Sequence, residues 1–320
     1  MKTGTQRENL VIVTEALAEL PGQWLRQQCE AAWCAPNEDD FERLLARAEG
    51  LVVRTYTTVD ESLIRRAPAL RVVARAGVGY DNIDVAACRA RGITVLNRPG
   101  ANTGAVVEFV LARLFEAIRP VTEVHAALPR AAWTALRDAA VTERELSEMT
   151  VGILGFGRIG RRLAAALAPL GPSVLYHDLL EIPAAECHGA RRVDQATLVA
   201  SSDVLSIHVD GRSGNRGLVD GTLLSHLREE AILINTSRGF VVDKPALAEA
   251  LRARPAARAL LDVHEPEPIP ADDPLLSIPG AHLFPHVAGR TETALENMSW
   301  VVRDLVSVLD GEEPEFEVLA

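Results

Sequence analysis

The segment Val151–Gly160, VGILGFGRIG, constrains the fold more than any other stretch of this chain. An apolar run ends in glycines spaced G-x-G-x-x-G, and a helix-like pattern follows. This order of strand, glycine-rich turn and helix is what a dinucleotide-binding unit needs. Gly155 allows the tight turn, Gly157 lets a pyrophosphate approach the backbone, and Gly160 lets the helix pack against the strand. The predicted cofactor loop comprises Gly155, Phe156, Gly157, Arg158, Ile159 and Gly160.

An acidic residue follows the next strand-like run, at residues 173–176. Asp178 lies near the position of the acid that accepts hydrogen bonds from an adenosine ribose in such units. Its carboxylate would repel a 2′-phosphate, so the sequence favours NAD over NADP. The alternative is a glycine-rich turn in another kind of α/β protein, which the surrounding strand–helix–strand pattern disfavours.

The length of 320 residues predicts two domains, and their cores must use Ala, Leu, Val and Ile because aromatics make up only 4%. A net charge of −11 argues against a nucleic-acid or anionic-membrane partner, whereas a small anionic substrate fits a locally basic site. The four cysteines form no C-x-x-C pair and no zinc-type spacing, which predicts free thiols, no metal and a reducing compartment. Residues 1–8 lack the apolar stretch of a signal peptide, and no apolar run approaches the roughly 20 residues of a membrane helix. We therefore expect a cytoplasmic protein.

Strand-like and helix-like segments alternate along both halves of the chain, which predicts parallel α/β sheets. In the N-terminal part, strands are expected at 10–14, 50–54, 70–74 and 93–96, and helices at 24–30, 41–48, 61–66 and 84–90. Further strands are expected at 151–154, 173–176, 204–209, 231–235 and 259–263, with helices at 104–118, 223–227 and 243–253. Asp243 can cap the last of these helices, and a single amphipathic helix is expected at 291–309.

Three ionisable residues stand at the ends of predicted strands: Arg238 follows 232–235, Glu267 follows 260–263, and His286 follows a short strand ending at Leu283 and Phe284. The carboxyl ends of parallel strands line the ligand crevice of an α/β sheet. Hydride transfer between a hydroxy acid and NAD needs a base for the hydroxyl proton and a cation for the carboxylate and carbonyl oxygens. These residue types supply both requirements.

Several motifs together resemble the D-specific 2-hydroxyacid dehydrogenase family over nearly the whole chain. The residues that carry the resemblance are Gly77–Asp84 (GVGYDNID), Asn97–Asn102 (NRPGAN), Gly152–Asp178, Asn235–Gly239 (NTSRG), Asp262–Pro268 (DVHEPEP) and Pro285–Gly289 (PHVAG). The resemblance implies two Rossmann-like, doubly wound α/β domains with the active site in the cleft between them. A flavodoxin-like substrate-binding domain would comprise residues 1–98 plus 288–320, and an NAD-binding Rossmann domain residues 99–287. It also implies a homodimer joined through the cofactor domain, with residues 126–148 in the contact, and no C-terminal regulatory domain.

The resemblance assigns roles to the same ionisable residues. His286 would be the base in oxidation and the acid in ketone reduction, and Glu267 would hold its imidazole in one tautomer and favour the protonated form. Arg238 would bind the substrate carboxylate and carbonyl oxygen. Glu265 is a rival for the role of Glu267. Further expected contacts are the backbone N–H groups of Val78 and Gly79 for the substrate carboxylate, and His208, Thr236 and Asp262 for the cofactor. Asp262 either tunes the site electrostatically or caps a strand.

Several arginines other than Arg238 depart from the family pattern, and they carry information about the substrate. Arg54 and Arg75 end two predicted strands, Arg98 lies in the crossover, and Arg290 follows the PHVAG motif. This cationic set is larger than one carboxylate requires, so we hypothesise a substrate with a second anionic group: a phosphate, a phosphonate or a carboxylate. The alternative is that some of these arginines pair with Asp81, Asp84 or Glu108.

The function expected from these observations is NAD-dependent oxidoreduction of a small 2-hydroxy or 2-keto acid, or an isosteric anion. The alternative of a different class is an NAD-sensing transcriptional corepressor on the same scaffold, which the three catalytic residue types disfavour. Phosphoglycerate, glyoxylate or hydroxypyruvate, lactate-like, and phosphonate or phosphite substrates all remain open, as does the physiological direction.

Overall fold

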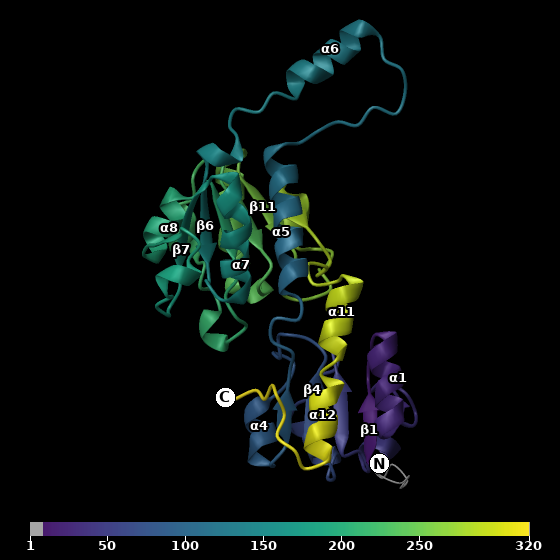
Figure 1. Cartoon of the computed structure of the whole chain (residues 1–320). Coiled ribbons are helices and arrows are strands. Elements are labelled where there is room, and N and C mark those ends of the chain that lie inside the picture. The colour runs from purple at the N-terminus through teal and green to yellow at the C-terminus, as the bar shows by residue number, and fades with distance from the viewer. Residues whose placement is uncertain (1–8, 320) are drawn as a thin grey trace. The chain divides into compact units, whose positions relative to one another are not determined.

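Two parallel sheets organise the chain, and each belongs to a separate unit (Figure 1). The computed structural model describes residues 9–319. One unit runs to Asn102 and resumes at Gly289, and the other spans Thr103–Ala288. The expectation about a signal peptide concerns residues that lie outside the described part of the chain. Two parallel-sheet α/β domains were predicted, and this fold class is confirmed.

The first unit contains a five-stranded sheet in the order β2-β1-β3-β4-β5. This is the flavodoxin-like order, in which the strand sequence reverses between β1 and β3. The strands are β1 (Leu10–Val13), β2 (Glu30–Trp33), β3 (Gly50–Val53), β4 (Val72–Arg75) and β5 (Thr94–Leu96). The helices are α1 (Glu19–Gln28), α2 (Phe41–Leu45), α3 (Glu61–Arg66), α4 (Val85–Ala90), α11 (Glu292–Ser299) and α12 (Val302–Leu309).

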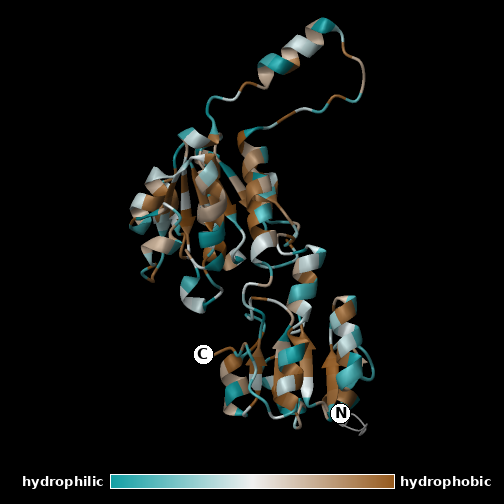
Figure 2. Cartoon of the chain, viewed as in Figure 1, coloured by the Kyte–Doolittle hydropathy of each residue, from teal (hydrophilic) through white to brown (hydrophobic). Residues whose placement is uncertain are grey.

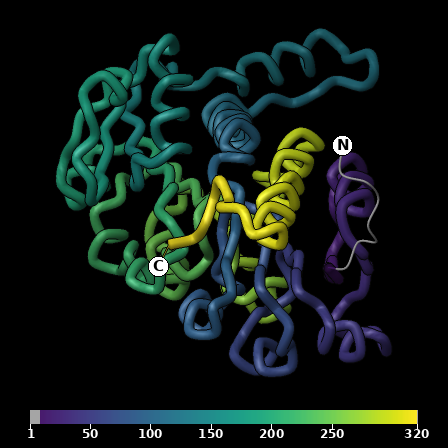
Figure 3. Tube along the Cα trace, turned by 60° about the horizontal axis from the view of Figure 1, so that its bottom comes forward, coloured from purple at the N-terminus to yellow at the C-terminus, as the bar shows by residue number. Residues whose placement is uncertain are grey.

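The helices nearest the C-terminus complete this first unit. Figure 3 shows α11 and α12, in yellow, beside α1, in purple. Leu305 of α12 is fully buried and packs over Gly50 of β3, where a Cβ would lie 3.4 Å from Leu305 Cδ1. The single helix expected at 291–309 is therefore wrong, since two helices cover this span. At the break, the Ser299 hydroxyl donates to the carbonyl of Leu295 and accepts the N–H of Ala18, which bends the helix end.

The second unit contains a seven-stranded sheet in the order β12-β11-β10-β9-β6-β7-β8, and every registered pair is parallel. This is the Rossmann order, extended by one strand, and it reverses between β6 and β9. The strands are β6 (Thr150–Leu154), β7 (Ser173–His177), β8 (Arg191–Arg192), β9 (Val204–Ile207), β10 (Ile232–Asn235), β11 (Arg258–Leu261) and β12 (Ala281–Leu283). The α-helices are α5 (Thr103–Ile118), α6 (Arg130–Ala139), α7 (Arg158–Leu167), α8 (Gln195–Ser201), α9 (Gly221–Ser225) and α10 (Lys244–Ala253). Figure 2 shows the hydrophobic strands at the centre of each sheet.

Two strands escaped the sequence analysis, β2 and β8. The β2 sequence EAAW has no β-branched residue, and its pairing with β1 makes it a strand, not the end of a helix. By contrast, the predicted cap at Asp243 is confirmed, because its carboxylate accepts the N–H of Ala246 at 3.0 Å.

The segment between α5 and β6 is a long excursion that carries α6 (Figure 1). Nearly every side chain in it is exposed, and Trp133 retains half of its accessible surface. Residues 126–148 showed little periodicity in sequence, and their one α-helix buries none of its residues. Within residues 9–319, no helix is long and apolar enough to cross a membrane.

Candidate active site

The glycine loop joins β6 to α7 at the point where the order of the second sheet reverses. Gly155 has a φ of 91°, and a Cβ there would lie 2.6 Å from the carbonyl carbon of His208, so only glycine fits. A Cβ on Gly160 would overlap the carbonyl oxygen of Gly155. At Gly157, which precedes the first turn of α7, a Cβ would meet nothing within 4 Å. The loop thus presents an open backbone surface at a helix N-terminus, which fits the pyrophosphate of a dinucleotide.

Asp178 lies beside this loop at the end of β7. Its Oδ2 accepts the N–H of Phe156 at 2.6 Å, and its Oδ1 accepts the N–H of Leu180 at 2.9 Å. The side chain of Phe156 is fully buried and stacks on Tyr176 with ring centroids 4.0 Å apart. The side chain of Phe156 therefore belongs to the core, and the predicted contact of this residue with the cofactor stays a prediction. Arg158 is exposed, and Ile159 packs against the core.

His208 follows β9 and lies next to the same loop. Its Nε2 lies 2.8 Å from the Ser206 hydroxyl, and its Nδ1 lies 3.2 Å from the Thr236 hydroxyl. Burial lowers the pKa of His208 to about 3, so the imidazole is neutral across the physiological range. His208 and Thr236 thus bond to each other, and their contact with the cofactor stays a prediction.

Arg238 is held by a tight turn after β10. The Asn235 side chain accepts the N–H of Ser237 at 3.0 Å and donates to the carbonyl of Arg238 at 3.0 Å. The Ser237 hydroxyl donates to the carbonyl of Val209 at 2.6 Å, which ties the turn to the end of β9. The sequence analysis quoted Asn235 as part of a motif without giving it this positioning role.

Gly239 allows a second loop to approach the Arg238 turn. A Cβ on Gly239 would overlap the carbonyl group of His264 and lie 2.6 Å from the backbone nitrogen of Glu265. Any larger residue would push the loop after β11 away from the turn. That loop carries Glu267, so this glycine helps to set the spacing between the cation and the acid.

His286 and Glu267 form a hydrogen-bonded pair. Nδ1 of His286 lies 2.9 Å from Oε2 of Glu267, and Oε1 of Glu267 accepts the N–H of His264 at 2.9 Å. Burial raises the pKa of Glu267, but the bonds from His286 and His264 outweigh burial and lower this pKa overall. A carboxylate on Nδ1 leaves Nε2 as the nitrogen that can exchange a proton with a substrate. The His286 side chain is 42% exposed, which keeps it accessible.

The backbone of His286 has a φ of 54°, an uncommon left-handed conformation for a residue with a side chain. The buried carboxylate of Asp262 accepts the N–H groups of the next two residues, Val287 at 2.8 Å and Ala288 at 2.9 Å. Burial raises the pKa of Asp262, partly offset by these two bonds. Asp262 therefore fixes the turn that presents His286, and its predicted contact with the cofactor stays a prediction.

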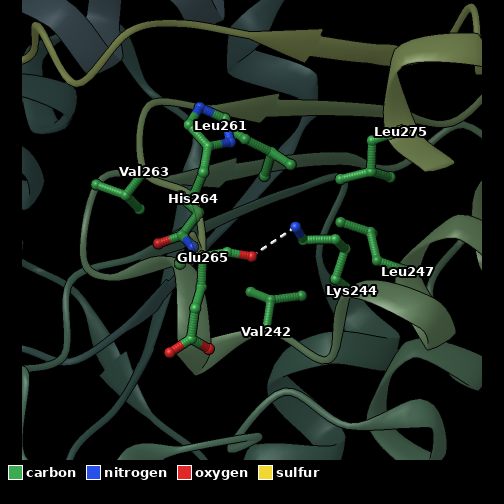
Figure 4. Close-up of a pocket in the computed structure, with 10 residues that line it drawn as sticks. Val242, Lys244, Leu247, Leu261, Val263, His264, Glu265 and Leu275 are labelled. Atoms are coloured by element: carbon green, nitrogen blue, oxygen red, sulfur yellow. Dashed lines mark hydrogen bonds between the residues drawn. The ribbon is translucent and has the colours of Figure 1, made fainter. Parts of the chain in front are cut away.

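Glu265, the rival acid, has another partner. Its carboxylate receives two hydrogen bonds from Arg216, at 2.6 and 2.8 Å. Lys244 donates to its backbone carbonyl at 2.6 Å and also to Asp273 at 2.6 Å. Figure 4 shows Lys244 and Glu265 beside a small, mainly apolar cavity of about 20 Å³ under this loop, lined also by Val242, Leu247, Leu261, Val263, His264 and Leu275. Glu267 is thus the acid that faces His286, while Glu265 anchors the loop.

The arginines of the first unit have different surroundings. Arg98 lies 3.6 Å from carboxylate oxygens of both Asp304 and Glu315, and its guanidinium stacks on Phe316. Arg98 thus forms ion pairs with the C-terminal part of the chain, and these partners are not the acids proposed from the sequence. Its contact with a substrate stays a prediction. The guanidinium of Arg75 lies against Gly77, where a Cβ would overlap it.

The predicted substrate contact of Arg75 stays a prediction, and Arg54 and Arg290 form a cationic pair in this unit. Nη1 of Arg54 donates to the carbonyl of Ala16 at 2.9 Å, and Arg290 is exposed. Burial, and then the charge of Arg290, lower the pKa of Arg54. The N–H groups of Val78 and Gly79 have no acceptor within residues 9–319, so both can receive an anion. The same described range contains no cluster of three metal-ligating side chains.

Comparison with known proteins identifies the family. Residues 111–288, more than half of the chain, match the NAD binding domain of the D-isomer specific 2-hydroxyacid dehydrogenases. The chain belongs to this family. Membership makes it an NAD-dependent oxidoreductase of 2-hydroxy acids, as the sequence predicted, and does not favour the corepressor alternative.

Individual relatives cover most of the chain. It is 39% identical to the (S)-sulfolactate dehydrogenase of Chromohalobacter salexigens over 302 residues, which are 92% of this chain and 96% of that protein. It is 35% identical to the D-3-phosphoglycerate dehydrogenase of Archaeoglobus fulgidus over 86% of this chain, but spans only 52% of that protein. Among solved structures, the NAD-dependent formate dehydrogenase of Staphylococcus aureus in complex with NAD has a TM-score of 0.80 at 26% identity, covering 98% of this chain and 99% of that one.

Proposed function

We propose that this dehydrogenase interconverts a short 2-hydroxy acid and its 2-keto acid, and that the substrate carries a second anionic group, with a sulfonate as the leading candidate. The hydrogen-bonded pair of His286 and Glu267 carries the assignment of the reaction. The second anion is supported by Arg54 and Arg290 and by the 39% identity to a sulfolactate dehydrogenase. Phosphorylated and carboxylated substrates are the other outcomes of the test.

The proposed chemistry follows from the charges that the residues carry. NAD supplies the hydride acceptor in oxidation and, as NADH, the donor in reduction. Arg238 binds the carboxylate and the carbonyl oxygen, and its hydrogen bond strengthens as that oxygen gains negative charge during reduction. Nε2 of His286 donates the proton to this oxygen, and the carboxylate of Glu267 stabilises the imidazolium before the transfer. In oxidation the same nitrogen removes the hydroxyl proton.

NADH absorbance with a substrate panel tests the proposal. The panel pairs 3-sulfopyruvate and a phosphorylated 2-keto acid with the monoanions glyoxylate and pyruvate, and includes the corresponding hydroxy acids with NAD. We expect turnover of the sulfonate at a lower KM than the monoanions. Equal KM values for sulfopyruvate and pyruvate would rule out the sulfonate, equal KM values for the monoanions and every dianionic substrate would refute the second-anion part, and no turnover of any 2-keto or 2-hydroxy acid would refute the whole proposal.

An arginine variant addresses the cationic pair directly. Arg290→Ala should raise KM for the dianionic substrate about tenfold, the usual order for one charge-assisted contact, and change KM for glyoxylate far less. Arg91→Ala is a matched control, because Arg91 is also an exposed arginine of the first unit. Equal increases in KM for both substrates would assign Arg290 to general structure.

We also propose that two copies pair through the segment that carries α6. Its exposed apolar side chains support this: Val121, Val124, Leu128, Trp133 and Val141 retain between 38 and 79% of their surface. In Figure 2 the segment carries hydrophobic colours that no other part of the second unit covers. Sedimentation of the protein should give a dimer, and Trp133→Asp should shift it toward the monomer. A monomeric native protein would refute the pairing.

A cytoplasmic location remains our proposal. The four cysteines are buried and form no disulfide with one another, which suits a reducing compartment. Cell fractionation of the native host tests it.

A further inference from the structure

The first sheet has its own reversal point, and two charged residues flank it. The order β2-β1-β3-β4-β5 reverses between β1 and β3. Glu15 lies just beyond the carboxyl end of β1, and Arg54 follows β3 directly. Ligands of open α/β sheets bind outside the carboxyl ends of the strands at such a point. Arg54 is therefore placed where a ligand is expected, and Glu15 is its neighbour in the adjacent strand connection.

The carboxylate of Glu15 accepts hydrogen bonds from the backbone of the turn formed by residues 54–57. Its Oε1 accepts the N–H groups of Arg54 at 3.1 Å, Tyr56 at 3.0 Å and Thr57 at 3.2 Å, and its Oε2 accepts that of Thr55 at 2.9 Å. Four consecutive amides thus converge on one side chain. Burial raises the pKa of Glu15, but these bonds outweigh burial and lower this pKa, so the group is ionised at neutral pH.

A second side chain holds carbonyl groups of the same turn. Nδ2 of Asn82 donates to the carbonyl of Thr57 at 2.6 Å and to that of Arg54 at 3.3 Å. The N–H groups and the carbonyl groups of the turn are therefore both fixed by side chains from other loops. Such a backbone has little freedom to move, and the direction in which Arg54 leaves it is set in advance.

We infer that Glu15 is a positioning residue that presents Arg54 to the second anionic group of the substrate, a sulfonate or a group of the same geometry. Glu15 itself, being an anion, does not bind this group. It acts through the turn. Its negative charge also offsets the repulsion between the positive charges of Arg54 and Arg290 before substrate binds. The inference rests on the proposed function.

A merely structural role for Glu15 makes a different prediction from a positioning role. If Glu15 acts through Arg54, the two variants are not additive: once Arg54 is removed, changing Glu15 has little further effect on KM for the dianion. If Glu15 only stabilises the fold, its effect on KM is the same with and without Arg54. A double-mutant cycle therefore separates the two roles.

The experiment uses the full-length enzyme with NADH and two substrates, 3-sulfopyruvate and glyoxylate. Glu15→Gln keeps one acceptor oxygen but replaces the other by an amide donor and removes the charge. We expect KM for sulfopyruvate to rise about tenfold, on the scale of lost hydrogen bonds to a charged group, with kcat and KM for glyoxylate changing less than about twofold. In the Arg54→Ala background the same change should raise KM for sulfopyruvate less than about twofold.

The matched control is Glu38→Gln. The Glu38 carboxylate also accepts a backbone N–H of the first unit, from Ala35 at 2.7 Å, but lies at an exposed site. It should alter neither KM. A second readout does not depend on catalysis: amide hydrogen exchange of a peptide covering residues 54–57 should accelerate in Glu15→Gln and not in Glu38→Gln.

The possible results distinguish a failure of the proposed function from a failure of the inference about Glu15. A native enzyme that prefers no dianionic substrate over glyoxylate refutes the second anion, and the inference with it. A native enzyme that has the preference, together with a Glu15→Gln variant that keeps it, refutes the inference alone. Additive effects in the cycle, or unchanged exchange at 54–57, refute it too.

Discussion

The neutral histidine beside the glycine loop predicts a specific acid sensitivity. The pKa of His208 is lowered from 6.5 to about 3 by burial. Between these two pKa values the unfolded chain binds a proton at His208 that the folded chain does not bind. The free energy of unfolding is therefore highest above pH 6.5 and decreases as the pH falls toward the folded-state pKa. At pH 5 the unfolded imidazole is almost fully protonated. Acidification from pH 7 to pH 5 should therefore lower the free energy of unfolding by about 2 kcal/mol through this one residue.

Because pH 5 lies well above the folded-state pKa, this loss of stability depends almost entirely on protonation of the histidine in the unfolded chain. The perturbation is His208→Gln, which removes the titrating group and retains a polar side chain. Its stability at pH 7 changes as well, so the quantity to compare is the difference between the two pH values. That difference should be about 2 kcal/mol smaller in the variant than in the native protein.

Urea unfolding of the full chain at pH 7 and pH 5, followed by circular dichroism, measures this difference. His226→Gln is the control, because His226 belongs to the same unit but is exposed, and it should leave the difference unchanged. If His208→Gln loses as much stability on acidification as the native protein does, the reasoning from burial is wrong.

Three further variants test the machinery around His286. Glu267→Gln removes the charge that favours the imidazolium. The value of kcat/KM for reduction should therefore fall about a hundredfold, and the pH above which activity is lost should decrease. An unchanged pH–rate profile would contradict this role. Asp262→Asn leaves one backbone N–H without its acceptor, and should cost about 1–3 kcal/mol of stability by thermal unfolding and lower kcat; wild-type kcat would contradict its positioning role. Gly239→Ala forces the His264 carbonyl away, and should lower kcat/KM about a hundredfold in the NADH assay, whereas native activity would mean that the loop spacing is not critical.

Local chemistry explains which parts of the site the sequence predicted. The glycine loop could be predicted because its glycine spacing between a strand and a helix is itself visible in the sequence, although the backbone that crowds Gly155 belongs to His208 after β9. The pair of Glu267 and His286 could be predicted because both follow strands of one parallel sheet. The sequence spacing already favoured Glu267 over Glu265, and the structure adds the reason: the carboxylate of Glu265 is paired with Arg216.

Long-range partners explain what the sequence did not predict. Arg98 appeared available for a substrate, but its acids, Asp304 and Glu315, come from the far end of the chain. Strand β2 has a helix-like composition and becomes a strand through pairing with β1. Glu15 showed one usable signal, an acidic residue directly after a buried strand, but its four amide partners lie about forty residues away, a distance that pattern analysis does not bridge.

The division of the first unit between two distant stretches of chain has a consequence for biosynthesis. One face of its sheet is covered by α12, whose Val302 and Leu305 are fully buried against residues such as Val11 and Val52. The ribosome releases those strands first and α12 only after the whole of Thr103–Ala288. The nascent chain therefore carries a partly uncovered apolar sheet face while residues 103–288 are made, and transiently exposed apolar surface of this kind is prone to aggregation.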